Sequence, residues 1–173
     1  PPAITDNSIP DGFEDEIYSF GFSAVDIDPT NDVLTWHMDT NATWLDLDLD
    51  SGVISGLPGN DHIGAYYLTM TVDDGNGGHN SREFDFVIEN VNDDPRITIP
   101  DIEMVLEDQL YDVEYEAMDI DPTNDTLSWS METNASWLHS IGSKIYGIPK
   151  NEDVGFYSVN VSVSDGNGGK DFS

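Results

Sequence analysis

The sequence contains no cysteine, no long apolar run and little positive charge. Without cysteine no disulfide can brace the chain, so something else must do so. No stretch approaches the roughly 18 consecutive apolar residues of a membrane-spanning helix. Lys and Arg account for only 5 of the 173 residues, against 35 Asp and Glu, which gives a net charge of −30 at pH 7. We therefore expect neither nucleic acid nor membrane as a partner, since binding to nucleic acid or anionic lipid requires basic surface.

The excess of acidic residues has two interpretations. Repulsion among so many like charges destabilises a compact fold unless cations or salt offset it. One interpretation is that the chain binds divalent cations, and the other is that its surface is adapted to a saline medium. A solvated acidic shell must account for most of the carboxylates in either case, because calcium sites would use only about ten of them.

The chain repeats itself. The heptapeptide at residues 26–32 returns unchanged at residues 119–125, an offset of 119 − 26 = 93. The pentapeptide Asp-Gly-Asn-Gly-Gly at residues 74–78 returns at residues 165–169, at an offset of 91. Between the copies lies an acidic segment, residues 90–95, that ends in proline. We therefore predict two modules, residues 1–95 and 96–173, and expect the chain to be a segment of a longer protein.

The pattern of apolar residues is that of β-strands. Short alternating runs bounded by Gly, Asn, Asp and Pro are typical of an all-β sandwich or barrel. In the first module we expect strands near residues 2–4, 17–24, 33–38, 44–49, 52–55, 65–72 and 82–89. In the second module the expected strands lie near residues 97–99, 111–117, 126–131, 137–141, 144–146 and 156–163.

Several positions give detail to the expected sandwich. Inward-facing side chains are predicted at Leu34, Trp36, Tyr66, Leu68, Met70, Val72, Phe84, Phe86 and Ile88. Tyr66 and Tyr157 resemble the tyrosine corner of immunoglobulin-type sandwiches. The second module has no counterpart of residues 82–89, so we expect its final strand to be absent from this segment. Truncation is the simpler explanation, and the alternative is a strand supplied by another chain through edge pairing.

Oxygen-bearing side chains recur at equivalent positions of the modules. Asp119 and Asp121 alternate at a strand end, so both can point to one side. A hard cation such as Ca²⁺ takes about six to eight oxygen ligands from carboxylates, amides and carbonyls. These acids therefore predict a calcium site, and the alternative is that Asp, Asn and Pro act only as turn formers.

Together these motifs resemble known families. The linker Asn90-Val91-Asn92-Asp93-Asp94-Pro95, followed by Asp119-Ile120-Asp121 and Ser164-Asp165-Gly166, resembles the calcium-binding set of cadherin repeats. The wider pattern A-x-D-x-D, L-T-W, W-L, G-V-I-S-G-x-P, G-x-Y and V-x-D-G-N-G-G resembles the dystroglycan-type cadherin-like domain of microbial surface proteins more closely. The resemblance covers nearly the whole chain, twice. It implies an all-β fold of two tandem immunoglobulin/cadherin-like β-sandwich domains.

The resemblance also implies a calcium site at the junction, with ligands from three places. The first module would supply Glu14 and Asp61. The linker and the second module would supply Asn90, Asn92, Asp93, Asp94, Asp119, Asp121, Asn124 and Asp165. A partial upstream site would use Asp26, Asp28, Asn31 and Asp74. The number of ions stays open, because the Asp-Arg-Glu triplet of cadherins is absent and Asn90 stands where they usually carry Asp.

Other candidate functions are weaker. The tryptophans recur in register, Trp36 with Trp129 and Trp44 with Trp137, which favours core packing over a platform for stacking sugars. No acid pair is singled out for glycoside hydrolysis, so we expect no enzyme and no catalytic residue. Asn41, Asn134 and Asn160 begin Asn-x-Ser/Thr triplets and are candidate glycosylation sites.

We therefore expect an extracellular, cell-surface tandem module in which Ca²⁺ stiffens the joint, serving as an adhesion or spacer unit. Its expected partners are calcium and either like modules, in homotypic contact, or cell-surface polysaccharide. Two alternatives stay open: a carbohydrate-binding module of a secreted protein, and a surface-layer or fibre subunit completed by strand donation.

Overall fold

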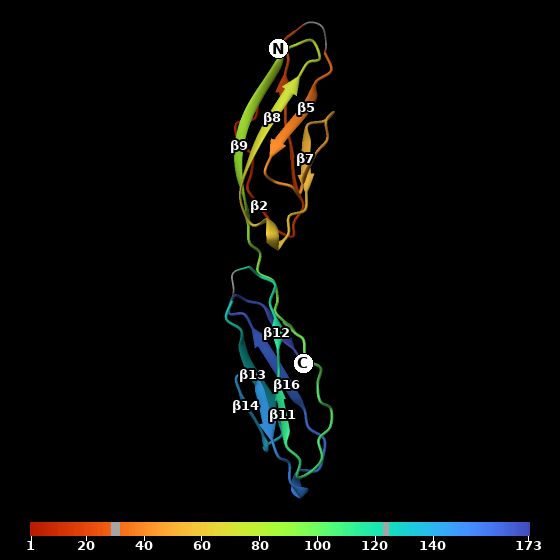
Figure 1. Ribbon diagram of the computed structural model, residues 1–173, viewed down its shortest axis with the longest axis vertical. Helices are drawn as coiled ribbons and strands as arrows, with labels where there is room; N and C mark the ends of the chain where they lie inside the picture. Colours follow the sequence, from red (N-terminus) through yellow and green to blue (C-terminus); the bar gives the residue numbers. More distant parts are fainter. Residues whose placement is uncertain (29–31, 123–124) are drawn as a thin grey trace. The chain divides into compact units, whose positions relative to one another are not determined.

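The computed structural model describes residues 1–28, 32–122 and 125–173. The chain forms two compact units, Pro1–Val91 (unit 1) and Asn92–Ser173 (unit 2), and strands dominate both (Figure 1). The domain boundary that we placed after residue 95 stays a prediction. Among the described residues, no helix is both long and apolar enough to span a membrane.

Unit 1 is a sandwich of two sheets. One sheet has the order β2 (Gly12–Phe13), β9 (His79–Glu89), β8 (Gly64–Asp73), β5 (Thr35–Thr40), with β2 parallel to β9 and the other pairs antiparallel. The other has the order β3 (Tyr18–Gly21), β7 (Val53–Gly56), β6 (Leu45–Leu47). A short ribbon of β1 (Ala3–Ile4) and β4 (Ala24–Val25) accompanies them, and the 3-10 helix η1 (Asn60–His62) leads into β8.

The core of unit 1 follows the alternation in the sequence. Leu68 and Met70 on β8, and Phe86 and Ile88 on β9, are at most 1% exposed. From the other sheet Ile54 is fully buried against them. Each such side chain stabilises the fold by about 1.5–3 kcal/mol relative to exposure. The prediction of a two-layer sandwich with these inward-facing positions is confirmed.

Unit 2 repeats this arrangement, with β16 and β17 shorter than their equivalents β8 and β9. One sheet has the order β13 (Ser128–Thr133), β16 (Val159–Ser164), β17 (Lys170–Phe172), and the other has the order β11 (Tyr111–Glu114), β15 (Lys144–Gly147), β14 (Leu138–Ile141). The ribbon is β10 (Arg96–Ile97) with β12 (Ala117–Met118). The 3-10 helix η2 (Asn151–Asp153) lies between β15 and β16.

Both tyrosine corners are present. The Tyr66 hydroxyl donates to the His62 carbonyl oxygen at 2.8 Å, and the Tyr157 hydroxyl donates to the Asp153 carbonyl oxygen at 2.8 Å. Each bond reaches back to the turn four residues upstream, from β8 in unit 1 and from the segment just before β16 in unit 2, as in immunoglobulin-type sandwiches. The resemblance predicted from the sequence is confirmed at this detail.

Two strands differ from the prediction. No strand was expected near β2, whose two residues pair in parallel with Ile88 and Glu89 and show no alternation long enough to detect. No strand was expected after residue 163 either, yet β17 pairs with β16. Its sequence is polar apart from Phe172, so pairing with β16 and not hydrophobic alternation defines it.

A glycine sits against a tryptophan in each unit. A Cβ atom on Gly56 would overlap the carbonyl oxygen of Trp44 and lie 2.8 Å from Cε3 of its indole, and Gly147 stands in the same relation to Trp137. Gly59 is a matched control, because a Cβ there would meet no atom within 4 Å.

We predict that Gly56→Ala lowers the free energy of unfolding by about 1–3 kcal/mol through overpacking. Gly59→Ala should change it by no more than about 0.5 kcal/mol. Urea denaturation followed by tryptophan fluorescence measures both variants. Equal stability of the two variants would show that Trp44 moves away from the added methyl group without a loss of folding free energy.

Candidate metal site

The Asp-Gly-Asn-Gly-Gly loop wraps around the carboxylate of its own first residue. In unit 1, Oδ1 of Asp74 accepts hydrogen bonds from the backbone amides of Asn76 and Gly78, both at 2.8 Å. A Cβ on Gly78 would overlap Oδ2 of the same carboxylate, so only glycine fits there. Successive amides that converge on one anion form a typical nest. The loop therefore fixes Asp74, which is only 8% exposed, in one orientation.

Unit 2 builds the same nest. Oδ1 of Asp165 accepts from the amides of Asn167 at 2.7 Å and of Gly168 and Gly169 at 3.1 Å each. A Cβ on Gly169 would overlap Oδ2 of Asp165. In both units the backbone amides of the loop hold Oδ1 of the carboxylate, and in unit 2 Oδ2 accepts from the side-chain amide of Asn92.

Three acids of unit 1 converge at this point. Asp26, Asp32 and Asp74 each offer a carboxylate oxygen, and the three oxygens lie within 4.8 Å of one another. Asp26 follows β4, Asp32 precedes β5 and Asp74 follows β8, so three loops at one end of the sandwich bring them together. Three negative charges this close repel one another strongly unless a cation lies among them.

Asp26 has one carboxylate oxygen with a hydrogen-bond donor and one without, among the described residues. Its Oδ1 accepts from the backbone amide of Asp28 at 3.0 Å. Its Oδ2 is buried and has no hydrogen-bond partner among the described residues. Burial of an unpaired carboxylate oxygen raises the free energy of the folded state. A cation bound at this atom would lower it.

In unit 2 the linker residues reach the equivalent loops. Asn92 donates through Nδ2 to Oδ2 of Asp165 at 2.8 Å, and the backbone amide of Asp93 donates to Oδ2 of Asp121 at 3.3 Å. Asp94 accepts from the backbone amide of Lys170 at 3.3 Å. The structure thus brings together residues that the sequence assigned to the linker and to the second module.

The unsatisfied oxygen recurs in unit 2. Oδ2 of Asp119, at the position equivalent to Asp26, is buried with no hydrogen-bond partner among the residues described, and so is Oδ2 of Asp125. Asp121 donates its backbone amide to Oδ1 of Asp119 at 3.1 Å and is itself only 7% exposed. The acids equivalent to the unit 1 cluster do not gather as closely, and Oδ2 of Asp165 is bonded to Asn92 instead.

Three predicted residues lie elsewhere in unit 1. Glu14 is fully buried, and its Oε1 accepts from the backbone amide of Val91 at 2.9 Å. Asn90 is half-buried at the end of β9, and Asp61 is exposed in η1. The structure therefore places Glu14 and Asn90 at the chain's exit from unit 1, whereas Asp61 joins no described cluster.

Sequence reasoning missed two acids and placed two others on undescribed positions. Asp32 and Asp125 were not among the predicted ligands, although their exact repetition at an offset of 93 was a signal that could have found them. The predicted ligands Asn31 and Asn124 lie outside the described residues. Asp28 is described and exposed.

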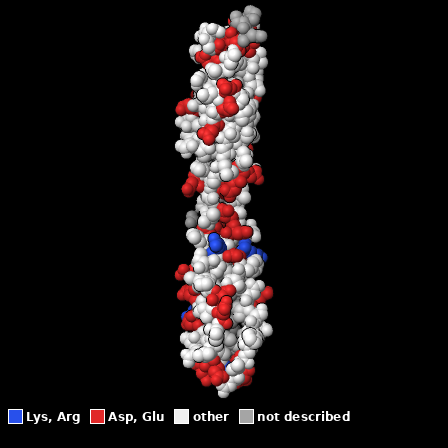
Figure 2. All heavy atoms as spheres, turned by 90° about the vertical axis from the view of Figure 1, so that its right-hand side faces the viewer, with Lys and Arg blue, Asp and Glu red and all other residues white. Residues whose placement is uncertain are grey.

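Hydrogen bonding to these carboxylates stabilises their charged forms. The side-chain amide of Asn92 is the main cause that holds the pKa of Asp165 below its usual value, with the loop amides adding to it against the effect of burial. For Asp74 the amide of Asn76 is the main cause of a lowered pKa, again against burial. Both groups are therefore poised as anions. Acidic side chains also spread over the face of both units in Figure 2.

The tryptophans lie against the cores, and the candidate glycosylation sites lie on the surface. The four tryptophans pack against the two hydrophobic cores, which confirms the core interpretation. Asn41 and Asn134 are exposed, and their Oδ1 atoms accept from the amides of Tyr67 and Ser158. Asn160 is exposed on β16.

A family model decides the classification of the chain. The model described as "Putative Ig domain" matches residues 1–89, just over half of the sequence. The chain belongs to this immunoglobulin-like family. The finer resemblance to dystroglycan-type domains stays a prediction. The comparison with curated proteins gives no match.

Solved structures similar to this Ig-like chain include cadherin ectodomains. Mouse cadherin-23 EC22-24 aligns over 99% of this chain with a TM-score of 0.57 and 16% identity. Protocadherin gamma B7 domains 1-4 align over 99% with a TM-score of 0.56 and 17% identity, and protocadherin gammaB4 over 99% with 0.52 and 19%. This chain spans 64%, 47% and 33% of those chains, respectively. At such identities the likeness shows the fold alone.

The lowered pKa of Asp74 gives a pH prediction for the metal-free protein. Because its folded-state pKa lies below the unfolded value of about 3.9, its stabilising effect is fully present above that value and is lost as the pH falls through the folded-state pKa. We predict that, in chelator, Asp74→Asn is less stable than wild type at pH 7 and that the difference shrinks below about pH 4.

Urea denaturation at both pH values measures this difference. Asp46→Asn, which makes the same charge change at an exposed position of β6, is the control and should differ little from wild type at either pH. A stability difference for Asp74→Asn that does not change with pH would contradict the role of the nest.

Proposed function

We propose that each Ig-like unit binds Ca²⁺ at the loop end that carries its Asp-Gly-Asn-Gly-Gly nest, and that the chain is a calcium-stiffened spacer or adhesion unit of an extracellular, cell-surface protein. The single observation that carries this proposal is the pair of repeat-equivalent atoms Asp26 Oδ2 and Asp119 Oδ2. Both are buried without a hydrogen-bond partner among the described residues. The same unsatisfied atom at the same place in two copies fits a ligand better than an accident of packing.

The chemistry of the donors favours calcium over other metals. The proposed set in unit 1 is Asp26, Asp32 and Asp74, with Asp28 next to them. In unit 2 it is Asp93, Asp94, Asp119, Asp121, Asp125 and Asp165, with Asn92. Every donor is an oxygen, and the chain has no cysteine, so the soft and nitrogen-rich sites typical of zinc or copper do not fit. A loop-built cluster of carboxylates suits the flexible coordination of Ca²⁺ better than the strict octahedron of Mg²⁺.

A metal at these loops would act on the linker. Asn92 and Asp93 already contact Asp165 and Asp121 in unit 2. An ion held by the same carboxylates would fasten the linker to unit 2 and offset repulsion among its acids. The likeness to cadherin ectodomains supports an extracellular setting. Three further points stay predictions. They are a share in the ion for Glu14, Asp61 and Asn90, association between like modules, and glycosylation of Asn41, Asn134 and Asn160.

No observation favours a second function strongly enough to propose it. A carbohydrate-binding module would need an exposed aromatic platform, but all four tryptophans pack against the cores. We propose no catalytic role.

Thermal unfolding in calcium and in chelator tests the proposal. A ligand at about 100 times its dissociation constant adds about 2.7 kcal/mol of stability, which corresponds to about 10–20 °C in melting temperature for a domain of this size. We expect a rise of this order in calcium for wild type. We expect a much smaller rise for Asp26→Asn/Asp119→Asn, since each site loses the negative charge of its buried, unsatisfied ligand.

The control variant is Asp46→Asn/Asp85→Asn, which removes two charges at exposed positions outside the clusters. It should keep the full calcium effect. Sodium chloride at matched ionic strength separates specific binding from screening of the net charge. An equal rise in sodium chloride, or an unchanged calcium effect in Asp26→Asn/Asp119→Asn, would favour a salt-adapted surface and overturn the proposal.

A further inference from the structure

The glycine-rich loops place an asparagine directly before a glycine. Both copies of the pentapeptide Asp-Gly-Asn-Gly-Gly contain such a pair, Asn76-Gly77 in unit 1 and Asn167-Gly168 in unit 2. Gly77 has φ +99° and Gly168 has φ +124°, a backbone conformation that residues with a side chain rarely adopt. The loop therefore requires glycine at this position, and the Asn-Gly pair is part of its construction.

An asparagine that precedes glycine is open to a spontaneous reaction of its side chain, and asparagine is a thermolabile residue for this reason. The backbone nitrogen of the glycine loses its proton and attacks Cγ of the asparagine. The new N–Cγ bond forms, the Cγ–Nδ2 bond breaks, and the side-chain amide leaves with the proton as ammonia. Water then opens the five-membered succinimide at either carbonyl, which gives aspartate or isoaspartate. The reaction needs only water, an exposed asparagine and a glycine nitrogen that is free to attack.

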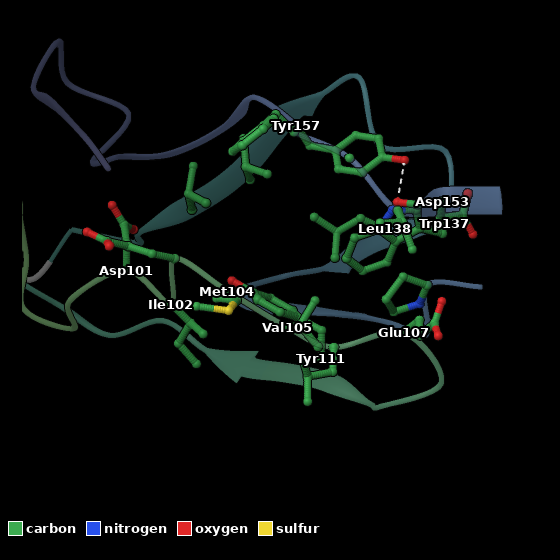
Figure 3. A pocket seen from close by; sticks show the side chains of 18 of the residues that line it. Asp101, Ile102, Met104, Val105, Glu107, Tyr111, Trp137, Leu138, Asp153 and Tyr157 are labelled. Atoms are coloured by element: carbon green, nitrogen blue, oxygen red, sulfur yellow. Dashed lines mark hydrogen bonds between the residues drawn. The ribbon is translucent and has the colours of Figure 1, made fainter. Parts of the chain in front are cut away.

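Both asparagines are accessible to water. Asn76 and Asn167 are exposed, and so are the glycines that follow them. A Cβ atom on either glycine would meet no atom within 4 Å, so the succinimide ring has room to form. The groove of unit 2, which Met104, Leu138 and Tyr157 line in Figure 3, does not include this loop. Exposure therefore does not separate the two sites.

The hydrogen bonding of the glycine nitrogen does separate them. In unit 2 the backbone amide of Gly168 donates to Oδ1 of Asp165 at 3.1 Å. In unit 1 the nest of Asp74 uses the amides on either side of Gly77, whose own amide has no hydrogen-bond acceptor among the described residues. A proton donated to a carboxylate is held more firmly than one that faces water, so the nitrogen of Gly77 is the better nucleophile.

The leaving group in unit 1 is also weakly held. Nδ2 of Asn76 donates to the carbonyl oxygen of Asp74 at 3.5 Å, which is the limit of a hydrogen bond. Loss of this side-chain amide therefore breaks no strong contact of the loop.

We propose that Asn76 is the site of a spontaneous modification, a deamidation that loosens the nest of unit 1 as the protein ages, and that Asn167 is protected from it. The amides of Asn76 and Gly78 flank the reacting bond, and both donate to Oδ1 of Asp74. Isoaspartate lengthens the backbone between these amides by one atom, so they no longer converge on one oxygen in the same geometry. The aspartate product instead adds a negative charge beside Asp74. The proposal does not depend on calcium.

Mass spectrometry of the intact chain tests the proposal. The chain is kept folded in chelator, at neutral pH and in ¹⁸O-labelled water, and the conversion of each asparagine is followed with time after digestion. Because the two loops have the same five residues, a difference between Asn76 and Asn167 in the folded chain comes from structure. We expect Asn76 to react about tenfold faster or more, the change that one hydrogen bond to a charged group makes in a rate.

Two internal references accompany this comparison. In concentrated urea the nest is lost, so Asn76 and Asn167 should react at equal rates. Asn134 is exposed but precedes alanine, so in the folded chain it should react more slowly than Asn76.

Matched variants connect the reaction to the stability of the nest. Asn76→Gln and Asn167→Gln keep an amide but react more slowly, because the ring they would form is larger. Once Asn76 is converted, we expect the melting temperature of unit 1 to fall by about 5 °C or more in wild type, since the hydrogen bonds to Asp74 weaken. Asn167→Gln should lose as much on ageing, whereas Asn76→Gln should keep its initial value.

Three outcomes would overturn the proposal. They are equal rates for Asn76 and Asn167 in the folded chain, a rate for Asn76 no higher than that of Asn134, and an equal loss of stability in aged Asn76→Gln. All of these measurements are made in chelator, so a missing effect of calcium on melting would contradict only the proposed function.

Discussion

A carboxylate oxygen that leaves water needs a donor or a cation, and this requirement governs the loop end of both units. The nests of Asp74 and Asp165 satisfy one oxygen each with backbone amides. Asp26 and Asp119 have no equivalent nest, and each keeps one buried oxygen without a donor among the described residues. We propose that, in a chain of net charge −30, a bound cation satisfies these oxygens with little rearrangement.

The nests and the glycine–tryptophan contacts show how a disulfide-free sandwich holds its ends. The loops have few apolar side chains, so backbone amides directed at Asp74 and Asp165 do the ordering there. Further along each unit, the tyrosine corners hold the turns before β8 and β16, and the contacts of Gly56 with Trp44 and of Gly147 with Trp137 lie in the other sheet. The same devices occur twice because the sequence repeats.

Periodicity and repetition made much of the fold predictable. The alternation of Leu68, Met70 and Val72 with polar residues fixed which face of β8 is buried, and the position of Tyr66 indicated its corner. The strand β2 was not predictable, because its two residues carry no period and form only through pairing with β9. Asp32 was not predicted as a ligand, because in the sequence it follows Asp-Pro-Thr-Asn, which is typical of a turn. Only the distances among Asp26, Asp32 and Asp74 place it in an acidic cluster. The ring contacts of Trp137 with Tyr111 and Tyr157 required spatial neighbours that sequence spacing does not give.

A crystal structure of the chain grown in calcium tests the central claim most directly. The account predicts one ion within about 2.3–2.6 Å of Asp26 Oδ2 and another at the same range from Asp119 Oδ2, each surrounded by six to eight oxygens. If both atoms remain without an ion at saturating calcium, the claim that these buried oxygens are metal ligands is contradicted.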